Sequence, residues 1–140
     1  MLAYENGYGT ETAQQEYESE WFYSTIVDIC EKPERYVFFN DAPTEEDLEK
    51  CINLFGNFIA KVDARLADGR AHIAGDKITS GDFVMLMFVT SSYDNPHLKH
   101  AKIIEALGQQ LAAASNVQRV MAPMKELCAA GIAAAPKAVI

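Results

Sequence analysis

The fold is decided by one stretch in the middle of the chain, Gly75-Asp76-Lys77-Ile78-Thr79-Ser80-Gly81-Asp82-Phe83. Thr79 is a typical helix N-cap residue, and its hydroxyl is expected to accept a hydrogen bond from the backbone N–H of Asp82. The Asp82 carboxylate is expected to return a bond to the backbone N–H of Thr79, which completes a capping box. Ile78 before the cap and Phe83 inside the helix form the pair of a hydrophobic staple. This stretch predicts a helix that begins at Ser80, with Thr79 and Asp82 in structural roles.

The residues that follow the cap are apolar without interruption from 83 to 89. A helix with one apolar stripe lies at a surface, whereas a helix that is apolar on every side is typical of a buried position. We therefore expect a central helix from about residue 80 to residue 91, covered by other helices on all sides.

Two longer helices are predicted before this central helix. The first extends from residue 12 to about residue 31, because Thr12 and Gln15 have the spacing of a capping box and Pro33 marks its end or a kink. The second begins at Thr44, with Asp47 as the capping partner, and ends near Gly69. Its apolar residues recur every three or four positions, as on a helix with one buried side: Leu48, Ile52, Phe55, Ile59, Val62 and Leu66.

Helical patterns continue to the C-terminal end. Apolar residues at helical spacing mark residues 103–111 and 117–127, with Pro123 expected at a break or in a first turn. No stretch shows the period of two that is typical of a strand. The sequence therefore predicts an all-α helical bundle in which residues 1–140 form a single domain.

Size and charge narrow the range of functions. At 140 residues the chain is long enough for one domain with a proper core. The formal net charge of −8 argues against nucleic-acid binding, which needs a basic surface. No apolar run approaches the roughly 18–20 residues of a membrane-spanning helix. Three cysteines at wide spacing form no disulfide framework, so we expect a cytoplasmic protein.

The acidic residues are concentrated at the N-terminal end. Residues 1–31 hold seven acids and no base: Glu5, Glu11, Glu16, Glu18, Glu20, Asp28 and Glu31. A solvated acidic helix face is the simplest explanation. The alternative is a surface that orients a partner protein or a second subunit.

The histidines and cysteines of this chain are not expected to bind a metal or to act as nucleophiles. His97 and His100 have the spacing of a metal-binding pair, but no carboxylate or third ligand is near them in the sequence, so no metal site is expected. Among the cysteines only Cys30, which is close to Lys32, has a base beside it, and we expect inert buried thiols. The chain contains no glycine-rich phosphate loop and no Gly-x-Ser-x-Gly motif.

One pattern carries a family resemblance: Gly75-Asp76-x-Ile78-Thr79-x-x-Asp82-Phe83. It is similar to the hallmark of the C-terminal helical domain of glutathione transferases, where it starts the core helix. Tyr8-Gly9 and the aromatic stretch 21–29 look like the first long helix of that domain, and the resemblance covers roughly residues 8–127. Gly81 stands where the family usually has Ala, and Asn116 where a Pro is common.

The resemblance implies a function that needs a second unit. Family members carry an N-terminal thioredoxin-like domain that binds glutathione and activates its thiol, and only residues 1–7 precede the helical part here. The first hypothesis is that the chain supplies the apolar co-substrate side of a glutathione conjugation site in detoxification and is inactive alone. The partners would be glutathione as co-substrate, a hydrophobic electrophile and a thioredoxin-like domain or a second copy. The second hypothesis is a non-catalytic interaction or dimerisation module of the same fold.

The same resemblance suggests which residues meet the ligands. Tyr36, Phe38 and Phe39 correspond to the wall of the pocket for the apolar co-substrate, and the alternative is that these rings belong to the core. Asp28 matches the acid that reaches the amino group of glutathione in several classes, because a carboxylate suits an ammonium group. A surface position at the end of a helix is the alternative for Asp28.

Overall fold

The computed structural model describes residues 5–33, 37–38, 40–95 and 98–134. Within these ranges every regular element is helical, which confirms the all-α prediction. The elements are α2 (Ala13–Pro33), α3 (Glu45–Arg65), the 3-10 turn η2 (Leu66–Asp68), α4 (Ser80–Phe88), the π-helical turn η3 (Val89–Tyr93), α5 (Ala101–Ala113), α6 (Ser115–Leu127) and α7 (Ala129–Ala134).

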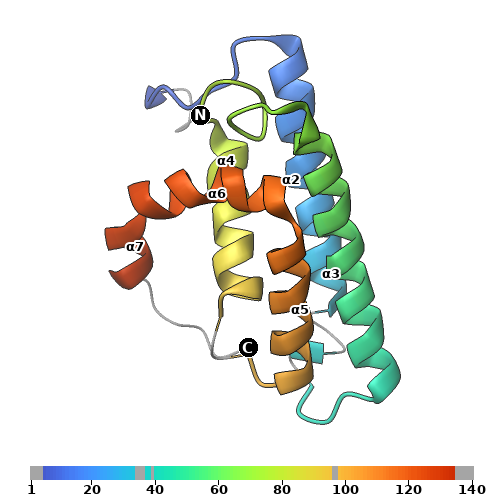
Figure 1. Cartoon of the computed structure of the whole chain (residues 1–140). Coiled ribbons are helices and arrows are strands. Elements are labelled where there is room, and N and C mark those ends of the chain that lie inside the picture. The colour runs from blue at the N-terminus through green and yellow to red at the C-terminus, as the bar shows by residue number, and fades with distance from the viewer. Residues whose placement is uncertain (1–4, 34–36, 39, 96–97, 135–140) are drawn as a thin grey trace.

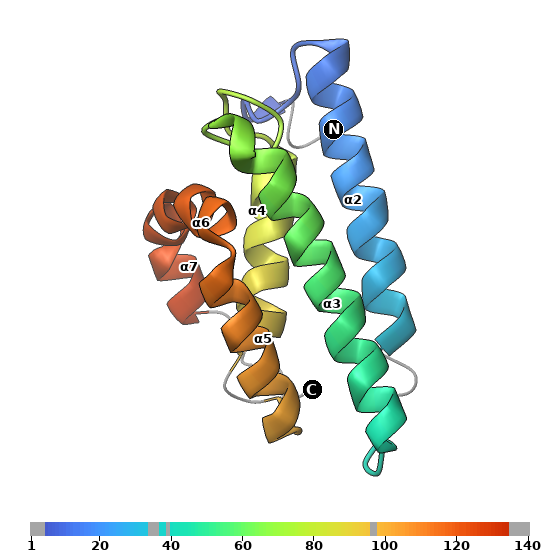
Figure 2. The same cartoon turned by 45° about the vertical axis from the view of Figure 1, so that its right-hand side comes forward.

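The helices form a bundle around α4. Helix α4 packs against α2 and α6, and α3 packs against α5, α6 and α2. Figure 1 shows α2, α3, α4 and α5 lengthwise in the bundle, with α2 and α4 running opposite to α3 and α5, while α6 lies across them. In Figure 2, α2 and α3 lie next to each other at one side of the bundle. The central helix of the sequence prediction is therefore contacted by segments from both halves of the chain.

Local side chains define where the helices begin. Thr44 and Asp47 form the capping box of α3, as predicted. At the start of α2 the Thr12 hydroxyl accepts a hydrogen bond from the backbone N–H of Gln15 at 3.2 Å. After η2 the chain turns at Gly69, whose φ of 87° is the left-handed conformation that glycine adopts without strain. These boundaries follow the sequence because each depends on residues within one helical turn.

Aromatic rings fill the centre of the core. The ring of Phe88 on α4 lies 5.4 Å from that of Phe55 and 5.3 Å from that of Phe58, both on α3. The buried Tyr93 packs on the same cluster, and its hydroxyl donates a hydrogen bond to the carbonyl oxygen of Phe55 at 3.0 Å. This contact satisfies the polar end of a buried tyrosine.

Two predictions are wrong, one about the burial of α4 and one about the position of Pro123. Helix α4 is not covered on every side, because Met87 is 61% exposed although its neighbours Leu86 and Phe88 are buried. Pro123 lies inside α6, which continues to Leu127, so it marks neither a break nor a first turn.

Candidate functional site

The carboxylate of Asp82 is the centre of a buried polar site at the start of α4. Its Oδ2 accepts hydrogen bonds from the backbone N–H of Thr79 at 2.8 Å and from the Thr79 hydroxyl at 3.2 Å. Its Oδ1 accepts a hydrogen bond from the backbone N–H of Ile73 at 3.0 Å. Thr79 and Asp82 are both fully buried and form the predicted capping box. The Asp82 carboxylate is thus occupied by structural hydrogen bonds, as expected for a cap.

A histidine lies beside this carboxylate. The Nδ1 atom of His72 is 3.4 Å from Asp82 Oδ1, and it has no hydrogen-bond partner among the described residues. His72 belongs to the loop between η2 and α4, where its backbone N–H bonds the carbonyl oxygen of Gly75 at 2.8 Å. The loop therefore turns back on itself next to the cap.

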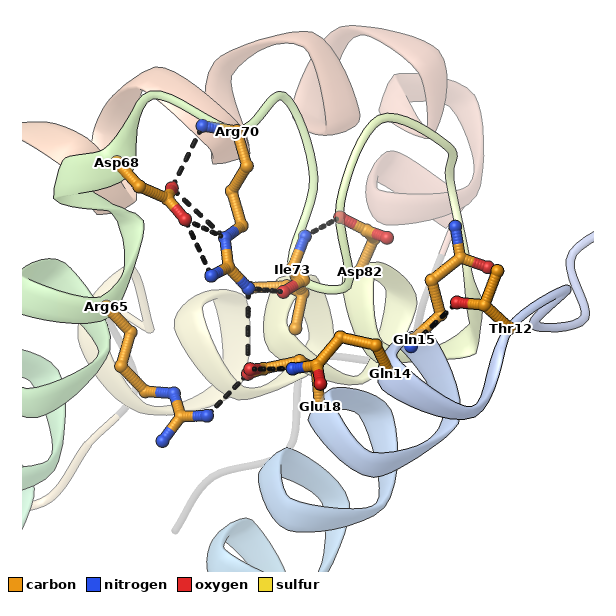
Figure 3. Close-up of polar contacts among 9 residues, drawn as sticks. All are labelled: Thr12, Gln14, Gln15, Glu18, Arg65, Asp68, Arg70, Ile73 and Asp82. Atoms are coloured by element: carbon orange, nitrogen blue, oxygen red, sulfur yellow. Dashed lines mark hydrogen bonds and ion pairs between the residues drawn. The ribbon is translucent and has the colours of Figure 1, made fainter.

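Glu18 of α2 forms a second buried polar cluster, which Figure 3 shows. Its Oε2 lies 2.5 Å from Arg65 Nη2 at the end of α3 and 3.6 Å from Arg70 Nη1 in the following loop. The side-chain amide of Gln14 donates to Glu18 Oε1 at 3.0 Å. The Arg65 guanidinium also lies over the ring of Trp21, 4.0 Å from its centroid. Glu18 therefore joins α2 to α3 and to the loop before α4.

Arg70 connects the Glu18 cluster with the Asp82 site. It donates to the carbonyl oxygen of Ile73 at 3.3 Å, and the backbone N–H of Ile73 is bound to Asp82. Its Nη2 also pairs with Asp68 Oδ2 at 2.7 Å. Hydrogen bonding from Arg70 lowers the pKa of the Asp68 carboxyl, and hydrogen bonding from Asp68 raises the pKa of Arg70. The arrangement holds a loop in place rather than presenting a reactive group.

The sequence prediction missed the role of Glu18. It counted Glu18 among the acids of a solvated face, whereas this residue is 7% exposed. The signal in the sequence is its position: Glu18 precedes Phe22 by four residues and Ile29 by eleven, and both are buried on the same side of α2. A buried carboxylate needs a basic partner, but its partners Arg65 and Arg70 are both far away in the sequence, so the sequence does not identify them.

The proposed co-substrate residues are only partly within the described structure. Tyr36 and Phe39 lie outside the described residues. Phe38 is buried, and its ring lies 6.1 Å from that of Phe55. Its placement favours the core alternative for Phe38.

Asp28 is exposed on α2. Its role in glutathione binding stays a prediction. Its position near the end of α2 fits the alternative of a surface residue equally well.

Exposed apolar side chains occur along α2 and α4, and we call Tyr23, Val27, Val84 and Met87 the α2–α4 face. Ser19 Oγ lies 3.5 Å from the point where a Cβ on Gly81 would be, so the edge of α2 that carries Ser19 borders α4. Tyr23 and Val27 follow Ser19 by one and two helical turns and therefore lie along the same edge.

The side chains of this face differ from ordinary core neighbours in their exposure. Tyr23 is 56% exposed, Val27 is 37% exposed and Met87 is 61% exposed. Val84 is half-buried and precedes Met87 by one turn on α4. The colours in Figure 1 show that α2 and α4 run in the same direction, and the two helices pack against each other.

The described residues offer little for metal or thiol chemistry. No three His, Cys, Asp or Glu side chains in this part of the chain gather as metal ligands. His97 lies outside the described residues, while His100 is half-buried. Burial raises the pKa of the Cys51 thiol to about 12, so this cysteine is not a nucleophile at neutral pH. None of the helices in the described ranges has the length and apolarity needed to cross a membrane.

Comparisons with known proteins returned no match: no family model, no curated protein and no solved structure is similar to this chain.

Proposed function

We propose that this chain is the helical half of a glutathione-transferase-type site and supplies its apolar co-substrate side. In this proposal a thioredoxin-like unit, in the same polypeptide or another one, binds glutathione and activates its thiol. The thiols of Cys51 and Cys128 fit a reducing, cytoplasmic setting.

The observation that carries the proposal is the α2–α4 face. An apolar helix at the centre of a bundle should have no open side, because exposing large apolar side chains to water is unfavourable. Met87 nevertheless projects from α4, whose residues from Phe83 onward are all apolar, with Tyr23 and Val27 exposed along the adjacent edge. Exposed apolar surfaces of this kind are typical of binding sites and interfaces. A second unit packed here would cover the missing side of α4.

The capping box supports the same proposal. Its buried Thr79 and Asp82 start the helix that carries Met87, as in the family pattern from which the resemblance was drawn. The cap fixes the first turn of α4, so Val84 and Met87 are held in place on a rigid element. A rigid apolar wall is suited to bind a hydrophobic electrophile next to glutathione.

The test uses a thioredoxin-like domain taken from an active glutathione transferase and held on glutathione-agarose. We expect the present chain to be retained only when that domain is on the resin. Met87→Glu should abolish retention, because it places a charge in the interface. Leu127→Glu is the matched control, since Leu127 on α6 is 60% exposed and lies outside the α2–α4 face.

The conjugation of glutathione to chlorodinitrobenzene then separates the two hypotheses. Retention together with a rate above that of the domain alone supports the co-substrate role. Retention without any added rate favours the non-catalytic interaction module. A chain that is never retained, or a Met87→Glu variant that binds as well as the unchanged chain, contradicts the proposal.

A further inference from the structure

The uncharged α2–α4 face has a strongly acidic border. Glu16 precedes Tyr23 by seven residues, Glu20 precedes Val27 by seven, and Glu31 follows Val27 by four. These spacings place all three acids on the same side of α2 as the two apolar residues. All three are exposed. The open side of α4 adds no charge of its own, because the exposed residues of this helix are Ser80 and Met87.

The border acids differ from other acids of the chain in their surroundings. Glu45 pairs with Lys102 at 2.9 Å, Asp41 pairs with Lys99 at 3.0 Å, and Lys125 is bound to Asp94. No ion pair is present for Glu16, Glu20 or Glu31 within the part of the chain that the structure describes.

Helix α2 itself contributes one base beside this border, Lys32, which stands directly after Glu31 and in the last turn. The negative field over the middle of the face is therefore not compensated by neighbours on either helix. A surface that docks here meets an apolar centre and a row of carboxylates along one side.

We infer that the partner of the α2–α4 face is a protein surface with an apolar centre and a row of lysine or arginine side chains that meets Glu16, Glu20 and Glu31. Charge complementarity selects this partner, because an acidic surface would be repelled and a neutral one would leave the carboxylates opposite apolar groups. A second copy of this chain carries the same net charge of −8, which argues against it as the occupant. The inference rests on the proposed function, since it names the chemistry of the unit that covers the face.

The carboxylates of Glu16, Glu20 and Glu31 mainly affect how the partner is oriented and how fast it associates. Exposed ion pairs are weak and are screened by salt, whereas burial of Met87 and Tyr23 provides the attraction at short range. A basic partner should therefore associate faster and more tightly at low ionic strength, with the carboxylates setting its direction along α2.

The test uses two synthetic helical peptides labelled with fluorescein. Both have the same leucine stripe, but one carries lysine and the other glutamate at every polar position. Fluorescence anisotropy measures their binding to the full chain at low and at high ionic strength. We expect the Leu/Lys peptide to bind and to lose affinity as salt is added, and the Leu/Glu peptide not to bind.

Matched variants locate the binding. The double change Glu16→Gln/Glu20→Gln should weaken binding of the Leu/Lys peptide about threefold to tenfold at low salt. Met87→Gln should weaken it as well, since it removes apolar contact without adding charge. The control Glu105→Gln/Glu126→Gln removes the same number of exposed charges from α5 and α6 and should leave the affinity unchanged.

Two results would overturn the inference: equal binding of both peptides, or equal weakening by the control pair and by the α2 pair. The peptide result is independent of the retention experiment. If the chain is retained by the thioredoxin-like domain but peptide binding does not depend on charge, only the basic partner is refuted. If peptide binding depends on charge but the chain is not retained, only the transferase role is refuted.

Discussion

Asp82 accepts a hydrogen bond from the backbone N–H of Ile73, nine residues earlier in the chain, at 3.0 Å. The same carboxylate binds the backbone N–H of Thr79 at 2.8 Å. One buried side chain therefore holds both the first turn of α4 and the loop that leads into it. Since α4 is the centre of the bundle, the loop and the central helix should lose their structure together.

Removal of the Asp82 carboxylate is expected to destabilise the fold strongly. Asp82→Ala leaves the N–H groups of Thr79 and Ile73 buried without an acceptor, and each such donor costs about 1–3 kcal/mol. Urea unfolding followed by circular dichroism measures the loss. Thr44→Ala is the control at an exposed cap, where we expect a loss of about 0.5–2 kcal/mol. An unchanged midpoint for Asp82→Ala would refute the role of this carboxylate.

The pair of Glu18 and Arg65 is expected to contribute measurable coupling. Glu18→Gln keeps the shape of the side chain but removes its charge, while Arg65 remains over Trp21. A double-mutant cycle with Arg65→Gln should give a coupling of about 0.5–3 kcal/mol, at the lower end because the Arg65 side chain is 34% exposed. The exposed pair of Glu46 and Lys50 serves for comparison and should show almost none. Equal coupling in both pairs would argue against a special role for Glu18.

Phe38 offers a direct test of the core and pocket alternatives. As a core residue packed on Phe55, Phe38→Ala should cost about 3–5 kcal/mol in unfolding free energy. Binding of a fluorescent apolar probe to the native protein should not fall. Met87→Gln should show the opposite result, with weaker probe binding and nearly unchanged stability. A stable Phe38→Ala variant that binds the probe poorly would restore the pocket assignment.

The three cysteines should differ in reactivity. Burial raises the pKa of the Cys51 thiol to about 12 and the side chain has no exposed surface. Because the thiolate is the reactive form, Cys51 should not react with a disulfide reagent in the native protein. Cys30 and Cys128 are partly exposed and should react first. Ellman's reagent should therefore count two thiols in buffer and three in urea; three equal rates in buffer would contradict the burial of Cys51.

The contact of Arg70 with Asp68 should make stability depend on pH in acid. Hydrogen bonding from Arg70 lowers the pKa of Asp68 below 3.8, so the native state binds this proton less tightly than the unfolded chain does. The contribution is present above the unfolded pKa and is lost as the pH falls through the folded value. Asp68→Asn should therefore lower the urea midpoint near neutral pH but not in strong acid. An equal deficit at both pH values would indicate a contribution that does not involve the charge.

The helix starts could be predicted because their hydrogen bonds are local. Thr44 and Thr79 each stand three residues before an Asp side chain that completes the cap. Thr12 accepts the backbone N–H of Gln15 as predicted, but the Gln15 side chain accepts from the backbone N–H of Glu11 instead of that of Thr12. A helix begins after each of the three threonines. The bond from Asp82 to Ile73 was not predictable, since it depends on the path of a loop. The buried pair of Glu18 and Arg65 was missed for the same reason, as 47 residues separate its members.

The sequence by itself determined the all-α class and the starts of α2, α3 and α4. These features depend on N–H groups that must find an acceptor within one helical turn, and on the period of apolar residues along a helix. Only the tertiary structure decided which side of α4 stays open. All residues from 83 to 89 are apolar, so no pattern within α4 distinguishes buried Phe88 from exposed Met87. The packing of α2 and α6 against α4 makes that choice, because burial depends on neighbours that are distant in the sequence.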